Sequence, residues 1–154
     1  MEKNLPAILR KRRLANALRF IGGGLRWRSS AAREQARIAV KEAAMDGGLT
    51  YGAWILNGVD GKSRVCLVSA MLQSIGHLKY ATMQETRERL LNERFITHSG
   101  DVLYVDDTLA DAYDSSVECA MVEAGVERFD ESQHQDLLQA AALRVIDAIP
   151  VKGE

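Results

Sequence analysis

The chain has 154 residues, 47% of them hydrophobic and 27% charged. This length fits one domain with extensions, and the apolar content excludes a disordered chain. Only two prolines interrupt the sequence, while Ala and Leu are abundant, so the composition favours helices.

Nothing in the sequence points to a membrane or an oxidising compartment. The two cysteines, Cys66 and Cys119, form no close-spaced motif and are interpreted as small buried residues. No run of about 18 apolar residues occurs, and the basic N-terminus lacks the features of a signal peptide. We therefore expect a cytoplasmic protein with no membrane contact.

The net charge of −1 hides a strong asymmetry along the chain. Residues 1–48 hold 11 Lys/Arg and 4 Asp/Glu, residues 49–105 hold 6 and 5, and residues 106–154 hold 3 and 12. Either the molecule has two faces with different partners, or its basic and acidic segments pair with each other within the chain or in a dimer.

The first 48 residues predict two helices. Residues 5–21 form the first, with Pro6 in its first turn, and the glycines at 22–24 are expected to end it. Ser29 or Ser30 can cap a second helix that runs to about residue 45 and ends at the glycines 47–48. A row of small residues on this helix, Ala32, Ala36, Ala39 and Ala43, predicts close helix packing.

The middle of the chain predicts two helices and a hairpin. Residues 49–57 fit either a short strand or a first core helix, and residues 58–62 have turn composition. Ser63 can cap a helix that ends at Gly76, and Thr82-x-x-Glu85 is a capping box for a helix to about Asn92. Residues 95–97 and 102–105 then flank Ser99-Gly100 as a β-hairpin.

The last part of the chain predicts acidic helices. A weakly patterned helical stretch covers about 108–124, and a clearer helix starts at the capping box of Ser132 and Gln135. Its apolar stripe consists of Leu137, Leu138, Ala141, Val145 and Ile149. This stripe, ended by Pro150, makes the helix a candidate for a homodimer contact.

Residues 63–105 carry the order helix, connector, capped helix and hairpin. The apolar positions that support this order are Val65, Leu67, Val68, Leu72, Met83, Leu90, Leu91, Phe95 and Ile96. The order resembles the winged helix-turn-helix superfamily, in which the second helix enters the DNA major groove and the hairpin is the wing. The expected fold is therefore mainly α, with a winged-helix-like core and a small β-hairpin at 49–107, a basic helical extension at 1–48 and an acidic helical region at 108–154.

The resemblance implies a small DNA-binding regulator of bacterial, phage or mobile-element type, with double-stranded DNA as its partner. Basic residues before the winged helix would supply phosphate contacts, and Trp27 could stack on a base. The expected DNA contacts are Arg10, Lys11, Arg12, Arg13, Arg26, Arg28, Lys79, Tyr80, Thr82, Gln84, Arg87 and Arg89.

A second hypothesis is a non-enzymatic protein-interaction module, such as an inhibitor or an assembly subunit. Glu85 and Glu88 lie on the helix face that would meet DNA, and the expected wing has no Arg or Lys between Ile96 and Val105. In this reading the acidic region 106–136 binds a basic protein or mimics the charge of nucleic acid.

Enzyme, metal and cofactor signatures are weak. His98, Ser99 and Asp101 are neighbours on a predicted turn and do not fit the geometry of a catalytic triad. The three histidines are scattered, and neither glycine-rich stretch makes a phosphate loop. We expect no enzyme activity, no cofactor and no metal site.

Overall fold

The computed structural model describes residues 6–57, 60–76, 83–98 and 104–154. The helices of these parts are α1 (Ala7–Gly24), α2 (Ser30–Met45), α3 (Leu67–Ser74), α4 (Met83–Glu93), α5 (Val105–Glu123) and α6 (Gln135–Asp147). The short strands are β1 (Leu25–Trp27), β2 (Ile55–Asn57), β3 (Ser63–Val65) and β4 (Phe95–Thr97). The prediction of a mainly α protein with little β-structure is confirmed.

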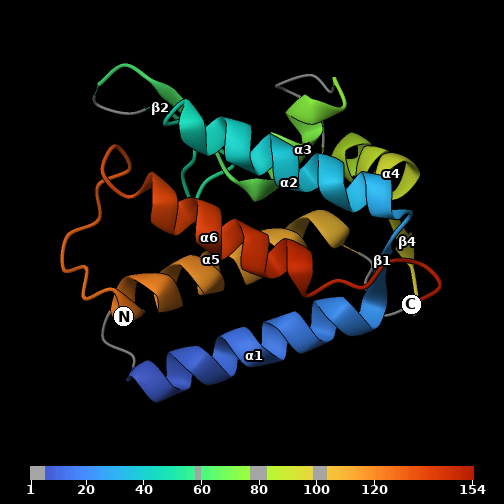
Figure 1. Cartoon of the computed structure of the whole chain (residues 1–154), viewed down its shortest axis with the longest axis horizontal. Coiled ribbons are helices and arrows are strands. Elements are labelled where there is room, and N and C mark those ends of the chain that lie inside the picture. The colour runs from blue at the N-terminus through green and yellow to red at the C-terminus, as the bar shows by residue number, and fades with distance from the viewer. Residues whose placement is uncertain (1–5, 58–59, 77–82, 99–103) are drawn as a thin grey trace.

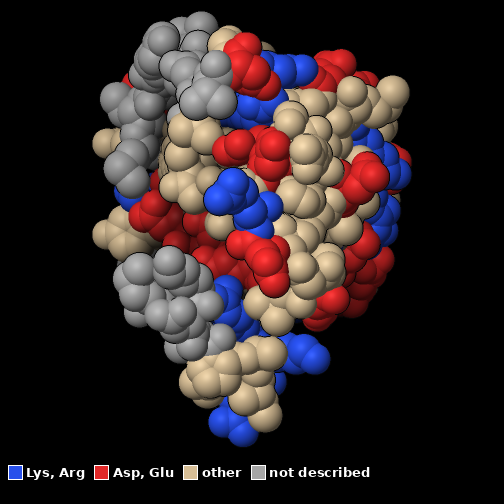
Figure 2. Space-filling model, turned by 90° about the vertical axis from the view of Figure 1, so that its left-hand side faces the viewer, with Lys and Arg blue, Asp and Glu red and all other residues tan. Residues whose placement is uncertain are grey.

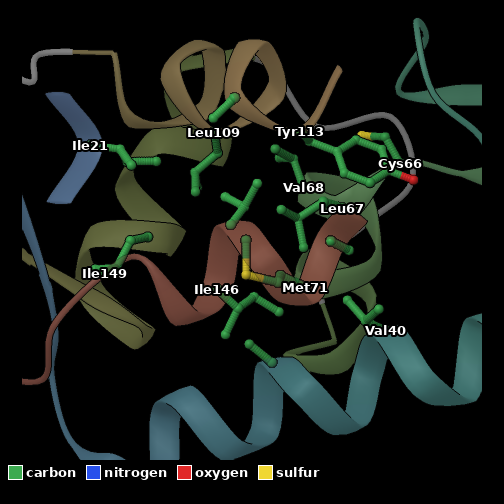
Figure 3. Packing of buried hydrophobic residues seen from close by; sticks show 14 of the residues in the cluster. Ile21, Val40, Cys66, Leu67, Val68, Met71, Leu109, Tyr113, Ile146 and Ile149 are labelled. Atoms are coloured by element: carbon green, nitrogen blue, oxygen red, sulfur yellow. The ribbon is translucent and has the colours of Figure 1, made fainter. Parts of the chain in front are cut away.

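Helix α5 lies in the middle of the molecule and packs against α1, α3, α4 and α6 (Figure 1). Figure 3 shows Met71 of α3 facing Ile146 of α6 in the common interior. Leu109 and Tyr113 of α5 close one side of that interior, and Val40 of α2 closes the other. Residues from all three predicted segments therefore share one buried cluster.

Two aromatic side chains that enter this interior find backbone partners for their polar atoms. The hydroxyl of Tyr113 donates to the Thr50 carbonyl at 2.8 Å, and the Trp27 indole N–H donates to the Ile146 carbonyl at 3.1 Å. Trp27 is fully buried, with its ring centre 4.3 Å from that of Phe95. These bonds remove most of the cost of burying a polar atom, so aromatic side chains can be used deep in the core.

The strand pairings differ from the predicted hairpin. β4 pairs antiparallel with β1, with Phe95 opposite Trp27 and Thr97 opposite Leu25. Val105, expected in the second strand of the hairpin, is the first residue of α5, and residues 99–103 lie outside the described parts. The prediction of a wing formed by 95–97 and 102–105 is therefore wrong at its described residues. A local turn signal was outweighed by the burial that Phe95 gains against Trp27.

The second sheet settles the choice that residues 49–57 left open. Their end is a strand, β2, which pairs antiparallel with β3. Ser63 therefore belongs to a strand and is not a helix cap, and α3 begins three residues later than expected, after Cys66 at its N-cap position. The alternation of Arg64 and Val65 with their neighbours gives too short a pattern to separate strand from helix in the sequence.

The first two helices confirm the predicted order but shift one boundary. Ser29 caps α2 by accepting from the Ala32 N–H, as expected. The glycines at 22–24 do not end α1 but form its last turn. A Cβ on Gly22 would lie 2.7 Å from the Ala148 carbonyl oxygen, so glycine is needed there for close approach of two backbones.

We expect Gly22→Ala to destabilise the protein by about 1–3 kcal/mol, because the new methyl group forces α1 away from residue 148. Gly23→Ala is the matched control, since nothing lies within 4 Å of its Cβ position. That control gains helix propensity and is expected to stabilise by up to about 1 kcal/mol. Urea unfolding measures both, and equal effects of the two substitutions would refute the close-approach explanation.

Candidate interaction surfaces

Acidic residues of α5 form one row along the helix. Asp107, Asp111, Asp114 and Glu118 follow each other at intervals of four, three and four residues, a spacing that places them on one face. The buried side chains Val105, Leu109, Tyr113 and Val117 occupy other positions of the same helix. Because those positions are buried in the core, the four carboxylates lie on the remaining face. We call these four residues the acidic row.

Two hollows lie along the acidic row and share Asp111 and Asp114. The larger, about 430 Å³, lies between α5 and α1 and is also lined by Arg13 and Glu118. The smaller, about 180 Å³, lies between α5 and the segment 52–54, where Trp54 lines it. Figure 2 shows acidic side chains gathered on the end of the molecule that is at the left in Figure 1, some of them set back in a recess.

Segment 51–54 holds its position beside the acidic row through the backbone. The Gly52 N–H donates to the Asp114 carboxylate at 3.0 Å, and Gly52 has a φ of +79°, a conformation that favours glycine. Tyr51 packs edge-on against Phe129 with ring centres 5.1 Å apart. Half-buried aromatic rings are thus placed next to carboxylates, a combination that suits a cationic group.

The carboxylates of the row are crowded and partly removed from water. Burial raises the pKa of Asp114 above its ordinary value, and the negative charge of Asp111 adds to this effect. Burial and the charges of Asp106 and Asp111 likewise raise the pKa of Asp107. Within the described residues, Asp111 and Asp114 form no ion pair, so a cation placed in either hollow would relieve their repulsion.

The basic run 10–13 is divided between the two sides of α1. Arg10 is 6% exposed and forms an ion pair of 3.8 Å with Glu118, and Arg13 lines the larger hollow. Lys11 and Arg12 are exposed. Arg10, one of the expected phosphate contacts, is buried against the acidic row. The charge asymmetry of the chain is thus partly an internal pairing of α1 with α5.

The predicted DNA contacts around β1 are also used within the chain. Arg26 donates to the carbonyls of Gly22 and Leu25 at 2.6 and 2.8 Å, and Arg28 donates to the Leu91 carbonyl. Trp27 is fully buried between them. Stacking of Trp27 on a base is therefore excluded, although it stood between two arginines in the sequence.

Helix α4, predicted to enter the major groove, uses both of its arginines to hold its own position. Arg87 donates to the Asp106 carboxylate at 2.8 Å and lies over the Tyr104 ring at 4.2 Å. Arg89 donates to the Ile75 carbonyl at 3.0 Å, and Gln84 donates to Glu88 at 3.2 Å. The remaining predicted contacts, Lys79, Tyr80 and Thr82, lie outside the described residues.

The apolar stripe of α6 is buried inside the chain. Leu138, Ala141, Val145 and Ile149 pack with α5 and α2 in the common core. The stripe is therefore no free surface for a second copy, and the reason for expecting a homodimer through α6 is removed.

The acidic row and its aromatic neighbours are not among the site residues expected from the sequence. The sequence contains a signal for the row, since four acids at helical spacing fall inside the acidic region 106–136. Tyr51 and Trp54 carried no such signal, because their place beside the row depends on the β2–β3 pairing and on the Gly52 contact.

Comparisons with protein-family models, curated proteins and solved structures give no match to this chain. In the described parts, no helix is long and apolar enough to cross a membrane. The same parts contain no group of three or more His, Cys, Asp or Glu residues that could hold a metal ion.

We expect Arg87→Ala to destabilise the protein by about 3 kcal/mol, because it leaves the fully buried Asp106 carboxylate without its cation. Glu88→Ala, an exposed change on the same helix, is the control and should stay within about 0.5 kcal/mol. Denaturant unfolding of Arg87→Ala, Asp106→Ala and the double variant should give a coupling of about 1–3 kcal/mol. Unchanged stability in Arg87→Ala would show that the ion pair with Asp106 does not stabilise the fold.

We expect Asp111→Asn to lower the pKa of both Asp107 and Asp114, since the charge of Asp111 raises both. A carboxylate whose pKa is raised by folding binds its proton more tightly in the folded state. The free energy of unfolding therefore falls as the pH rises from the ordinary pKa through the raised one. The variant should therefore be at least as stable as the parent at neutral pH. NMR titration of the side-chain carboxyl carbons measures the pKa values, and Asp136→Asn serves as an exposed control. Unaltered titration of Asp107 and Asp114 would refute the coupling.

Proposed function

We propose that this protein is a non-enzymatic interaction module that binds a basic segment of a partner protein along the acidic row of α5. The observation that carries the proposal is the pair of adjacent hollows that share Asp111 and Asp114. Within the described residues these two carboxylates have no cationic partner, while the neighbouring Glu118 already binds the guanidinium of Arg10. One end of the acidic row thus already binds an arginine of the same chain, and the partner would supply basic side chains for the rest of the row.

The two hollows suggest how a basic segment would lie. The smaller one, lined by Trp54 and three aspartates, fits a single Lys or Arg side chain whose cation faces carboxylates and an aromatic ring. The larger one continues beside α1, where Ser115 and Glu118 offer further acceptors. A segment with basic residues spaced to reach both hollows would therefore be preferred over an isolated cation.

The arrangement supports this function better than that of a DNA-binding regulator. The arginines of α4 hold that helix against α5 and α3, and Arg10, Arg26 and Arg28 bind partners within the chain. In a winged-helix unit, Phe95–Thr97 would pair with the second strand of the wing. Here these residues pair antiparallel with β1. Exposed Lys11 and Arg12 are the observation that keeps DNA as the second candidate.

The test uses a nine-residue peptide of alternating Arg and Ala. The chain has two tryptophans, and Trp27 is buried, so a change of emission on titration reports on Trp54 beside the smaller hollow. We expect binding that weakens at least fivefold in the double variant Asp111→Asn, Asp114→Asn. The control variant Glu127→Gln, Asp136→Asn changes the net charge equally at exposed positions elsewhere and should shift affinity less than twofold.

Two results would reject the proposal. One is equal loss of peptide affinity in both double variants, since it would show attraction to net charge only. The other is binding of mixed-sequence duplex DNA without any binding of the peptide. If the affinity for DNA also falls steeply as salt rises, the DNA-binding regulator would be favoured.

A further inference from the structure

Helix α1 packs by one face only. Its buried side chains Arg10, Leu14 and Ile21 face the core, and its principal neighbour is α5 (Figure 1). Eleven of the described residues between Ala7 and Gly23 are exposed, most of them on the side of the helix away from these buried residues. A long surface helix with one packed face and a plainly polar outer face would need no further explanation.

The outer face of α1 is not plainly polar. Ile8, Leu9 and Phe20 are 62%, 42% and 50% exposed, and they are the exposed large apolar side chains of this helix. At about 100° per residue, Leu9 and Phe20 fall on one row, and Ile8 falls about 100° around the helix from Leu9, on a row with Arg12 and Arg19. Ile8 and Phe20 are separated by about 18 Å along the helix axis, or somewhat more than three turns.

We propose that this outer face of α1 docks an acidic amphipathic helix of a partner protein. The apolar residues near its two ends would enter the apolar stripe of the partner, and Arg12 and Arg19 would meet its carboxylates. A partner helix of three to four turns matches the distance between Ile8 and Phe20.

The chemistry of the face distinguishes this occupant from two others. Duplex DNA would leave three exposed apolar side chains against phosphates, with no burial gained. A membrane surface requires a continuous apolar face, whereas Arg12, Asn16 and Arg19 interrupt this one. An acidic amphipathic helix uses both kinds of residue at once.

This surface is separate from the acidic row, and the charge of its partner is opposite. Arg13 turns toward the larger hollow on α5, while Arg12 is exposed on the outer side. A protein with both surfaces would bind a basic segment on α5 and an acidic helix on α1 simultaneously. The two proposals can therefore fail independently.

The test measures fluorescence anisotropy of a labelled 18-residue helical peptide of Leu, Glu and Ala, with Leu on one stripe. Two comparison peptides replace every Glu by Lys or every Leu by Ser. We expect the first peptide to bind at least tenfold more tightly than either comparison peptide, because both the charge and the apolar stripe contribute.

Variants of the protein locate the contact. Arg12→Glu with Arg19→Glu should weaken binding at least tenfold, and Ile8→Ser with Phe20→Ser at least fivefold. The controls are Lys41→Glu with Lys152→Glu for charge and Ile38→Ser for exposed apolar area, all on other elements. They should change affinity less than twofold, and circular dichroism checks that each variant remains folded.

Several outcomes would overturn the proposal. Equal affinity of the α1 variants and the controls would place the peptide elsewhere. Tighter binding of a 20-base-pair duplex or of phosphatidylglycerol vesicles than of the peptide would identify a different class of ligand. Self-association that is abolished by the α1 charge reversal would show that a second copy of this chain occupies the face.

Discussion

The burial of α5 on several sides at once is the constraint on which the rest of the molecule depends. A helix with four helical neighbours needs apolar positions on most of its circumference, and α5 supplies Leu109, Tyr113 and Val117 for them. Apart from Asp106, which is buried against Arg87 of α4, the acids Asp107, Asp111, Asp114 and Glu118 lie on the strip that faces α1 and the segment 51–54. The acidic row is thus a result of how the core is packed, and it would form whatever the partner is.

The same constraint explains why the charge asymmetry of the sequence is not a simple division into two surfaces. Docking α1 on α5 brings a basic helix against the row, and Arg10 becomes a buried partner of Glu118. Arg12 and Arg19 of α1 point outward instead, where they lie among exposed apolar side chains. Helix α1 therefore neutralises part of the acidic row with one side and presents exposed cations and apolar side chains on the other.

The helices that could be predicted are those whose signals are local. The cap at Ser29 and the breaks near Gly47 and Gly76 act within one or two turns, so they could be located from the sequence. The strand pairings could not, because β4 finds its partner in β1, far back in the chain, and the predicted partner 102–105 was simply the nearest one. The site residues followed the same division: the acidic region was visible, but the placement of Arg87 against Asp106 and of Trp54 beside the row depends on long-range contacts.

The position of Trp27 has a consequence for the order in which the chain can fold. Its backbone N–H donates to Pro150, its carbonyl accepts from Lys152, and its indole reaches Ile146, 119 residues away along the chain. On a ribosome, the first helices leave the exit tunnel long before these partners are synthesised. The tryptophan and the apolar side of α1 then stay exposed to water through most of translation, a period in which aggregation or a holding chaperone competes with folding. Slow codons or a pause before residue 146 would lengthen that period and would lower the yield of native protein without changing one amino acid.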